Sequence, residues 1–191
     1  MVGLRVTAFV LILAAAFSVE ARRSESAIKW VLYHGSESPP DNAIVAGFQR
    51  LDGVEVSSYV GRVWMNSIGA IVPAVVAQWE QYWAYAALRG HTIREVTTFE
   101  VAVLDNSSSA SVQWVPSAGG VPEGAVRVGV TSDNEYLFSC RVLDLDLSDP
   151  NPNVGQKRMM TPGALAGGKC YIEFWGNSLE YPTYEVLVIK D

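Results

Sequence analysis

The sequence is poor in the residues that most often hold metals. Its 191 residues include only 2 His and 2 Cys, and a structural zinc site takes four ligands of these types. We therefore expect no metal and no cofactor. A calcium site made of oxygen ligands is an alternative, because residues 144–149 alternate Asp with other side chains along one strand face. The spacing of an EF-hand is absent there, so a solvated acidic loop is the favoured interpretation.

The motifs of catalysis are missing as well. The chain has no nucleophile-elbow, zinc-binding or phosphate-loop motif and no glycine-rich cofactor fingerprint. His34 precedes a glycine and His91 follows one, both in turn-like contexts without an evident Cys or Ser partner. We therefore expect a protein that is not an enzyme. An enzyme would need a pocket that brings one of these histidines beside a carboxylate.

Positive charge is also scarce. Lys and Arg total 14 against 20 Asp and Glu, which gives a net charge of −6 and a pI near 4.9. Binding to nucleic acid requires clustered Lys and Arg, and docking on an anionic membrane surface requires basic segments. The composition therefore argues against both of these partners. Apolar residues make up 49% of the chain, which is typical of a globular domain.

After its first segment the chain lacks long apolar runs. That segment has Arg5, an apolar stretch over residues 6–17, and Ala21 at the end of a cleavage-site pattern, as in secretory signal peptides. The stretch is shorter than the roughly 20 residues that span a bilayer. We expect cleavage after Ala21, a secreted extracellular protein, and no membrane span in the mature form. An uncleaved anchor is the alternative.

Secretion changes how two further features are interpreted. Cys140 and Cys170 would meet an oxidising compartment, in which a disulfide persists; two buried free thiols are the alternative. Asn106 begins the sequon Asn-Ser-Ser within a polar stretch, so we expect it to be glycosylated.

The chain does contain an internal repeat. Residues 40–47 (PDNAIVAG) align with residues 122–129 (PEGAVRVG), and residues 98–104 (TFEVAVL) align with residues 183–189 (TYEVLVI). Four shorter matches keep the same order at offsets between 79 and 89 residues. The repeat predicts a signal peptide over 1–21, a first repeat over 22–105, a linker over 106–111 and a second repeat over 112–191.

The repeats have the pattern of an all-β fold. Short runs of β-branched and aromatic residues alternate with Gly and Pro, as in an antiparallel sandwich or barrel. One stretch conflicts with this, because Trp79, Tyr82 and Trp83 have helical spacing. Its second half aligns with residues 170–175 of the other repeat, which favours a strand over residues 82–88. A short helix there is the alternative.

The alignment also bears on the cysteines. Cys140 aligns with Gly61 and Cys170 with Ala84, so the second repeat has both cysteines and the first has neither. Joint presence and joint absence favour a bonded pair. The alignment further places Arg62 and Arg141 on matched strands, where each is expected to pair with Glu100 or Glu185 in a structural role.

The order of these motifs resembles the DM-nine repeat family, which includes lectin-like proteins and natterin-like proteins. The second repeat carries Trp114-Val115, residues 122–129, residues 137–141, Pro162-Gly163, residues 170–176 and residues 184–187, and the first carries weaker versions of most of them. The resemblance covers residues 28–190. It implies two pseudo-symmetric, sandwich-like β units whose terminal strands are exchanged between repeats. It also implies binding of mannose-type sugars and a role in innate recognition.

The residues that bind sugar in the family are replaced here. The corresponding positions are Gln49, Val75 and Thr92 in the first repeat and Thr131, Ala164 and Ser178 in the second. Valine and alanine offer no hydrogen bond to a sugar hydroxyl. Nearby polar residues are the candidates for a rebuilt site, although a role as solvated turn residues is the favoured interpretation of each: Asp52, Asp133, Asn134, Glu135, Asn177 and Glu180.

Tryptophans are a further candidate surface for a sugar face. Trp64, Trp79, Trp83 and Trp175 are the ones considered, and core packing is expected for most of them. Taken together, the sequence predicts a secreted, non-enzymatic, lectin-like protein with glycans as partners. A module that binds an extracellular protein instead, or forms a homodimer, is the alternative.

Overall fold

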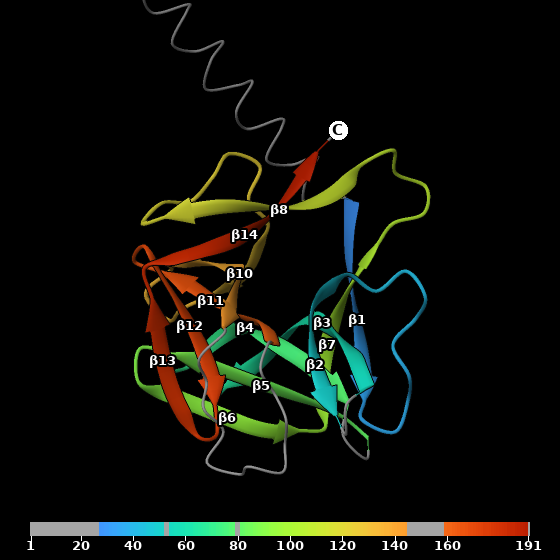
Figure 1. Ribbon diagram of the computed structural model, residues 1–191, viewed down its shortest axis with the longest axis horizontal. Helices are drawn as coiled ribbons and strands as arrows, with labels where there is room; N and C mark the ends of the chain where they lie inside the picture. Colours follow the sequence, from blue (N-terminus) through green and yellow to red (C-terminus); the bar gives the residue numbers. More distant parts are fainter. Residues whose placement is uncertain (1–26, 52–53, 79–80, 145–158, 191) are drawn as a thin grey trace, which may run out of the picture.

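The structure is a computed structural model that describes residues 27–51, 54–78, 81–144 and 159–190. This part of the chain is built of β-strands joined by turns (Figure 1), which confirms the expected all-β class. The strands, in chain order, are β1 (Ile28–His34), β2 (Val45–Leu51), β3 (Val54–Met65), β4 (Ala70–Gln78), β5 (Tyr82–Leu88), β6 (His91–Val96), β7 (Thr98–Leu104), β8 (Ser111–Ala118), β9 (Arg127–Val130), β10 (Tyr136–Asp144), β11 (Met159–Ala166), β12 (Lys169–Phe174), β13 (Asn177–Tyr181) and β14 (Thr183–Lys190).

The two halves of the chain repeat the same arrangement. Strands β1 to β7 correspond in order to β8 to β14, and each pairing within the first half has its counterpart in the second. For example, β1 pairs with β7 and β8 pairs with β14, both antiparallel. Residues 82–88 form β5. The prediction of a strand there is confirmed, and the alternative of a helix is wrong.

Six strands pair into a closed ring at the centre of the fold. The order of pairing is β2–β3–β4–β9–β10–β11, and β11 returns to β2. Each half contributes three strands. The halves meet at two seams of one residue pair each, Phe48 with Met160 and Ile71 with Val130. Closing the ring removes free edges from these strands.

A glycine from the repeated motif lies at each seam. A Cβ atom on Gly47 would stand 2.0 Å from the carbonyl oxygen of Met160, and one on Gly129 would stand 2.1 Å from that of Ile71. Only a residue without a side chain allows the backbones to approach this closely. The shared glycine of residues 40–47 and 122–129 therefore lets the two halves join.

The terminal strands remain within their own repeats, which corrects the expected exchange. In Figure 1 the pair β8–β14 lies at the top and the pair β1–β7 at the right, each continuing its own half. The physical reason is a stack that holds β1 on its own repeat. The guanidinium of Arg62 on β3 lies 4.3 Å from the ring centroid of Trp30 on β1 and also pairs with Glu100 on β7.

The second half repeats this stack. Arg141 lies 4.5 Å from the ring centroid of Trp114 and its Nε is 2.6 Å from Glu185. In the first half the Nε of Arg62 is likewise 2.6 Å from Glu100. Both predicted pairs are therefore confirmed, and each also contacts a tryptophan. Each stack joins the first, third and last strands of its half.

The predicted disulfide is confirmed. Cys140 on β10 and Cys170 on β12 are bonded and both are fully buried. They lie in an apolar cluster with Leu165, Ile172 and Val186. Their first-half counterparts Gly61 and Ala84 are also buried, and there the corresponding space holds the side chain of Val76. The bond thus supplements the core in the second half alone.

Several predictions concern residues beyond this description. The signal peptide over residues 1–21 and most of the acidic run over residues 144–149 lie outside the described residues. Asn106 is described and exposed, in a turn directly after β7. No helix of the described part is long and apolar enough to cross a membrane.

The stacks generate a prediction about stability. We expect Arg62→Ala and Arg141→Ala each to lower the free energy of unfolding by about 1–3 kcal/mol, because each leaves a partly buried glutamate unpaired and a tryptophan uncovered. Lys169→Ala is the control, since its pair with Glu180 is exposed and exposed ion pairs contribute little to stability. Urea unfolding measures the free energy of unfolding of the two arginine variants and of the control. Equal effects of the arginine and lysine variants would contradict the role of the stacks.

The disulfide generates a second prediction about stability. Replacing both Cys140 and Cys170 by alanine should lower the free energy of unfolding by about 2–4 kcal/mol, because the unfolded chain regains the freedom of a closed loop. Urea unfolding of the variant and of the reduced wild-type protein should give matching losses. A loss in the variant without a loss on reduction would assign the effect to packing.

Candidate functional site

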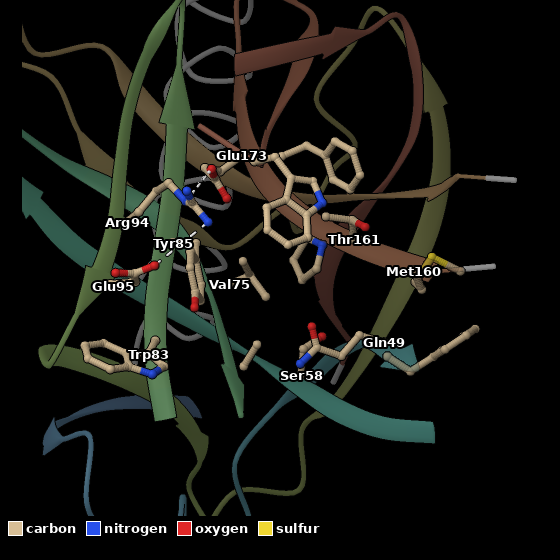
Figure 2. Close-up of a pocket in the computed structure, with 15 residues that line it drawn as sticks. Gln49, Ser58, Val75, Trp83, Tyr85, Arg94, Glu95, Met160, Thr161 and Glu173 are labelled. Atoms are coloured by element: carbon tan, nitrogen blue, oxygen red, sulfur yellow. Dashed lines mark ion pairs between the residues drawn. The ribbon is translucent and has the colours of Figure 1, made fainter. Parts of the chain in front are cut away.

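A cavity of about 430 Å³ opens beside the seam between β2 and β11 (Figure 2). Both halves of the chain line it. The first half contributes β2 to β6, and the second contributes β11, β12 and the turn after β12. The volume falls in the range of small-molecule sites. The lining residues are Phe48, Gln49, Ser58, Val75, Ala77, Trp83, Tyr85, Arg94, Glu95, Met160, Thr161, Pro162, Glu173, Phe174 and Trp175.

Two hydroxyl groups of this lining are buried without a partner. Ser58 on β3 is 2% exposed and Thr161 on β11 is 6% exposed, yet neither side-chain oxygen has a hydrogen bond among the described residues. Buried polar groups are almost always satisfied, and leaving one unpaired costs about 1–3 kcal/mol. One hydroxyl comes from each half of the chain. Both residues line the cavity, so a rotation of either side chain toward a ligand that fills the cavity would supply the missing bond.

Gln49 adds an oriented amide to the same wall. Its Nε2 donates to the carbonyl oxygen of Gln78 at 3.0 Å, and its side chain is buried. This bond uses the amide nitrogen and fixes the orientation of the group. The side-chain oxygen, Oε1, is therefore the atom that is left to accept a hydrogen bond from a ligand.

A charged pair lies at the opposite end of the cavity, as Figure 2 shows. The Nε of Arg94 on β6 is 3.1 Å from Oε1 of Glu173 on β12, and Glu173 is buried. The same Oε1 accepts a hydrogen bond from the backbone N–H of Gly176. Burial raises the pKa of Glu173 above its usual value of 4.5, while the Gly176 N–H and Arg94 act in the opposite direction.

Two irregular backbone features place residues at the rim. Trp175 has φ of 50° and precedes Gly176 at 84°, which is the geometry of a two-residue hairpin turn. A bulky residue with positive φ is uncommon. On β6 the pairing with β5 shifts between Ala84 and Ala86, and Glu95 has φ of 55°. Such a bulge redirects side chains, and here it brings both Arg94 and Glu95 to the cavity.

The other half of the chain serves as an internal comparison. By strand register, three polar residues of the cavity have buried apolar counterparts: Ser58 matches Leu137, Thr161 matches Val72, and Glu173 matches Ala87. All three counterparts belong to one apolar cluster. The bulge of β6 is likewise missing from β13, which pairs with β12 in regular register. The polar residues are therefore features of one site and not requirements of the fold.

The candidates named from sequence lie away from this cavity. Asp133, Asn134 and Glu135 are in the turn between β9 and β10. The hydroxyl of Thr131 donates to Asp133 and lowers the pKa of its carboxyl. Glu135 forms an ion pair with Arg89 at 2.7 Å. The carboxylates of Asp133 and Glu135 are thus engaged by other residues of the protein.

The remaining candidates are similarly placed. Glu180 on β13 pairs with Lys169 at 2.6 Å, and the side-chain amide of Asn177 donates to the backbone oxygen of Trp175. Asp52 lies outside the described residues. The structure brings Asp133, Asn134 and Glu135 together but does not join them to Asn177 in one pocket.

The tryptophans correct an expectation. Trp64 is 57% exposed and Trp175 is 50% exposed, so core packing is wrong for both. Trp83 is half-buried and lines the cavity together with Trp175. Trp79 lies outside the described residues.

Sequence reasoning missed most of the cavity, although one signal pointed to it. Two of the positions where family lectins hold their ligand residues, Gln49 and Val75, do line the cavity. Thr92 and Ser178 instead link the hairpins: Gly90 N–H donates to Ser178, and Thr92 donates to the backbone oxygen of Gly176. Following the positions of Gln49 and Val75, instead of searching for replacement carboxylates, would have led to this wall.

The described residues contain no group of three or more His, Cys, Asp or Glu side chains that could hold a metal ion. His34 contacts the hydroxyl of Thr98 at 3.3 Å, and His91 is exposed beside the turn at Gly90. Neither histidine lines the cavity.

Glu173 generates a prediction about pH. Its pKa is higher in the folded protein than in the unfolded chain, so the folded state binds the proton more tightly. Its contribution to stability therefore falls as the pH rises from 4.5 through the raised value. We expect the wild-type protein to lose stability relative to Glu173→Gln across this window. Urea unfolding at a series of pH values measures the difference. A difference that stays constant with pH would contradict the assignment.

Comparison with known proteins agrees with this fold. A family model for the DM9 repeat matches residues 52–144, from just before β3 to the end of β10. The nematode sperm cell motility protein MFP2B is similar in structure, with a TM-score of 0.57 and 15% identity over 85% of this chain. The similar region is 46% of that chain, and at this identity the likeness shows the fold alone. No curated protein matches the sequence. The match confirms, for residues 52–144, the resemblance of the motifs to the DM9 repeat family.

Proposed function

We propose that this protein is a secreted, non-enzymatic lectin that binds a mannose-type sugar in the cavity beside the β2–β11 seam. One observation carries the proposal: two buried hydroxyls, on Ser58 and Thr161, have no partner among the described residues and line a cavity of sugar-binding size. A ligand with many hydroxyl groups is suited to satisfy both.

The mixed character of the lining supports a sugar in particular. A sugar ring presents hydroxyl groups at its edge and C–H groups on its faces. The polar groups of Gln49, Ser58 and Thr161 suit the edge, and the rings of Trp83 and Trp175 suit a face. Pockets that combine an apolar wall with a few directed polar groups are the usual form of small-molecule sites.

The arrangement of charges supports binding without catalysis. Glu173 is the buried carboxylate of the cavity, and its Oε1 is engaged by both Arg94 and the Gly176 N–H. A general acid or base needs a proton that it can exchange with the substrate. The ion pair with Arg94 opposes that role, because it lowers the pKa of Glu173 against the effect of burial and occupies one carboxylate oxygen.

Secretion is supported by the chemistry of the chain. The buried Cys140–Cys170 disulfide is of the kind that persists in oxidising compartments. The sequon residue Asn106 is exposed and so accessible to glycosylation. A recognition role in innate immunity follows as the function that such a secreted lectin would serve.

A protein partner is the second candidate. The exposed apolar side chains Leu32, Trp64 and Tyr136 favour it, as does the replacement of the charged ligand residues of the family. If a protein partner binds these exposed side chains, the cavity has no role in binding. The experiment below separates the two, because only the first requires the cavity residues.

The proposal predicts opposite effects on stability and binding. Thr161→Val introduces the residue found at the matching position, Val72, and removes an unpaired buried hydroxyl. Ser58→Ala likewise removes the unpaired hydroxyl on β3. We expect each to raise the free energy of unfolding by about 1 kcal/mol and to weaken sugar binding about tenfold. A glycan array followed by calorimetry with mannose measures binding, and urea unfolding measures stability.

The control is Ser139→Ala, which removes a buried hydroxyl on β10 outside the cavity and should leave binding unchanged. Failure of the folded wild-type protein to bind any sugar on the array would overturn the proposal. Binding that is unchanged in both Thr161→Val and Ser58→Ala would place the sugar elsewhere on the molecule.

A further inference from the structure

We infer that the sugar taken by this cavity carries a protonated amino group, so that the preferred ligand class is a hexosamine with a free amine. This inference rests on the proposed function and names the chemistry of its ligand. Its observations lie at the end of the cavity formed by Glu173, Arg94 and Glu95.

The first observation is an excess of hydrogen-bond acceptors. Both described bonds to the Glu173 carboxylate end on Oε1, which leaves Oε2 for a ligand. The fixed amide of Gln49 offers its Oε1 in the same way. A protonated amine supplies three donors, more than a hydroxyl group at the same carbon. The lining therefore matches a ligand that is rich in donors.

The second observation is the sign of the local charge. Two carboxylates, those of Glu173 and Glu95, and one guanidinium, that of Arg94, line the cavity, which leaves a net charge of −1. Arg94 is already committed, since it lies 3.1 Å from Glu173 and 3.9 Å from Glu95. No lysine is among the lining residues. A ligand cation neutralises this excess, whereas an acidic sugar adds to it.

The third observation is an aromatic wall next to those carboxylates. Arg94 lies 5.8 Å from the ring centroid of Trp175, so this ring already faces a cation. The rings of Trp83 and Tyr85 line the same cavity. Aromatic faces attract cations through their quadrupole, and the effect grows when water is excluded. The wall thus favours an ammonium group over a neutral one.

The other half of the chain lacks this combination. The counterpart of Glu173 is Ala87, and the counterpart of Trp83 is the cation Lys169. The position matching Trp175 is Arg89, which is paired with Glu135. A positive ligand group would meet two basic residues there. Within the described residues, the structure therefore assigns this combination to the β2–β11 side of the ring.

Three sugars of one configuration test the inference: mannose, mannosamine and N-acetylmannosamine, compared by calorimetry near neutral pH. Because only the group at one carbon differs, we expect mannosamine to bind at least about tenfold more tightly than the other two. The glucose series is run in parallel. Glu173→Gln should remove this preference, and Glu95→Gln should reduce it.

Glu180→Gln is the matched control, since it removes an exposed carboxylate outside the cavity and should keep the preference. If Glu173→Gln does not fold, the comparison rests on Glu95→Gln. Equal binding of the free and acetylated amino sugars would overturn the inference and leave the proposed function standing. Binding of none of the sugars would overturn the proposed function itself. A preference that survives both substitutions would overturn the assignment to this end of the cavity.

Discussion

The structure depends on two seams at which strands from different halves of the chain meet through a single residue pair. Each seam requires a glycine, Gly47 or Gly129, because a carbonyl oxygen of the facing strand occupies the place of a side chain. With both seams closed, six strands form a ring, and the remaining strands extend from it. The candidate site opens beside one of these seams, so that its walls belong to both halves.

The two seams are alike in backbone but differ in their surroundings. Beside the β4–β9 seam the counterparts Leu137 and Val72 are fully buried in the apolar core. Beside the β2–β11 seam the same positions hold Ser58 and Thr161, and a cavity opens. The polar substitutions reduce the stability of the fold, as unsatisfied buried groups do. Local inconsistencies of this kind are expected at functional sites.

Much of the fold could be predicted from the sequence, because a duplicated chain contains its own comparison. The alignment of residues 40–47 with residues 122–129 sets the order of the strands, and the joint absence of Cys140 and Cys170 from the first half indicates their bond. The alignment also resolves residues 82–88 as a strand despite the helical spacing of their aromatic residues. Which residues form a strand within one repeat depends on the nearby sequence, and two aligned repeats give two independent views of that pattern.

The site could not be predicted in the same way, because it depends on which strands of different halves become neighbours. Ser58 and Thr161 are 103 positions apart in the chain, and nothing in their local sequence marks either as unpaired. The bulge that places Glu95 appears in sequence only as one extra residue between Thr92 and Val96. Conversely, Asp133 and Glu135 form a conspicuous acidic cluster, but their bonds are made within the turn and to Arg89.

The closed ring has a consequence for the assembly of single repeats. A chain with one repeat alone would leave unpaired the edge of β2 that now meets β11 and the edge of β4 that now meets β9. These two edges complement each other, since β11 is the second-half equivalent of β4 and β9 that of β2. Two copies related by a two-fold axis would regenerate the ring from identical subunits, with an isologous interface. In the tandem arrangement the two repeats are joined covalently and differ in sequence. The residues beside one seam can therefore differ from those beside the other.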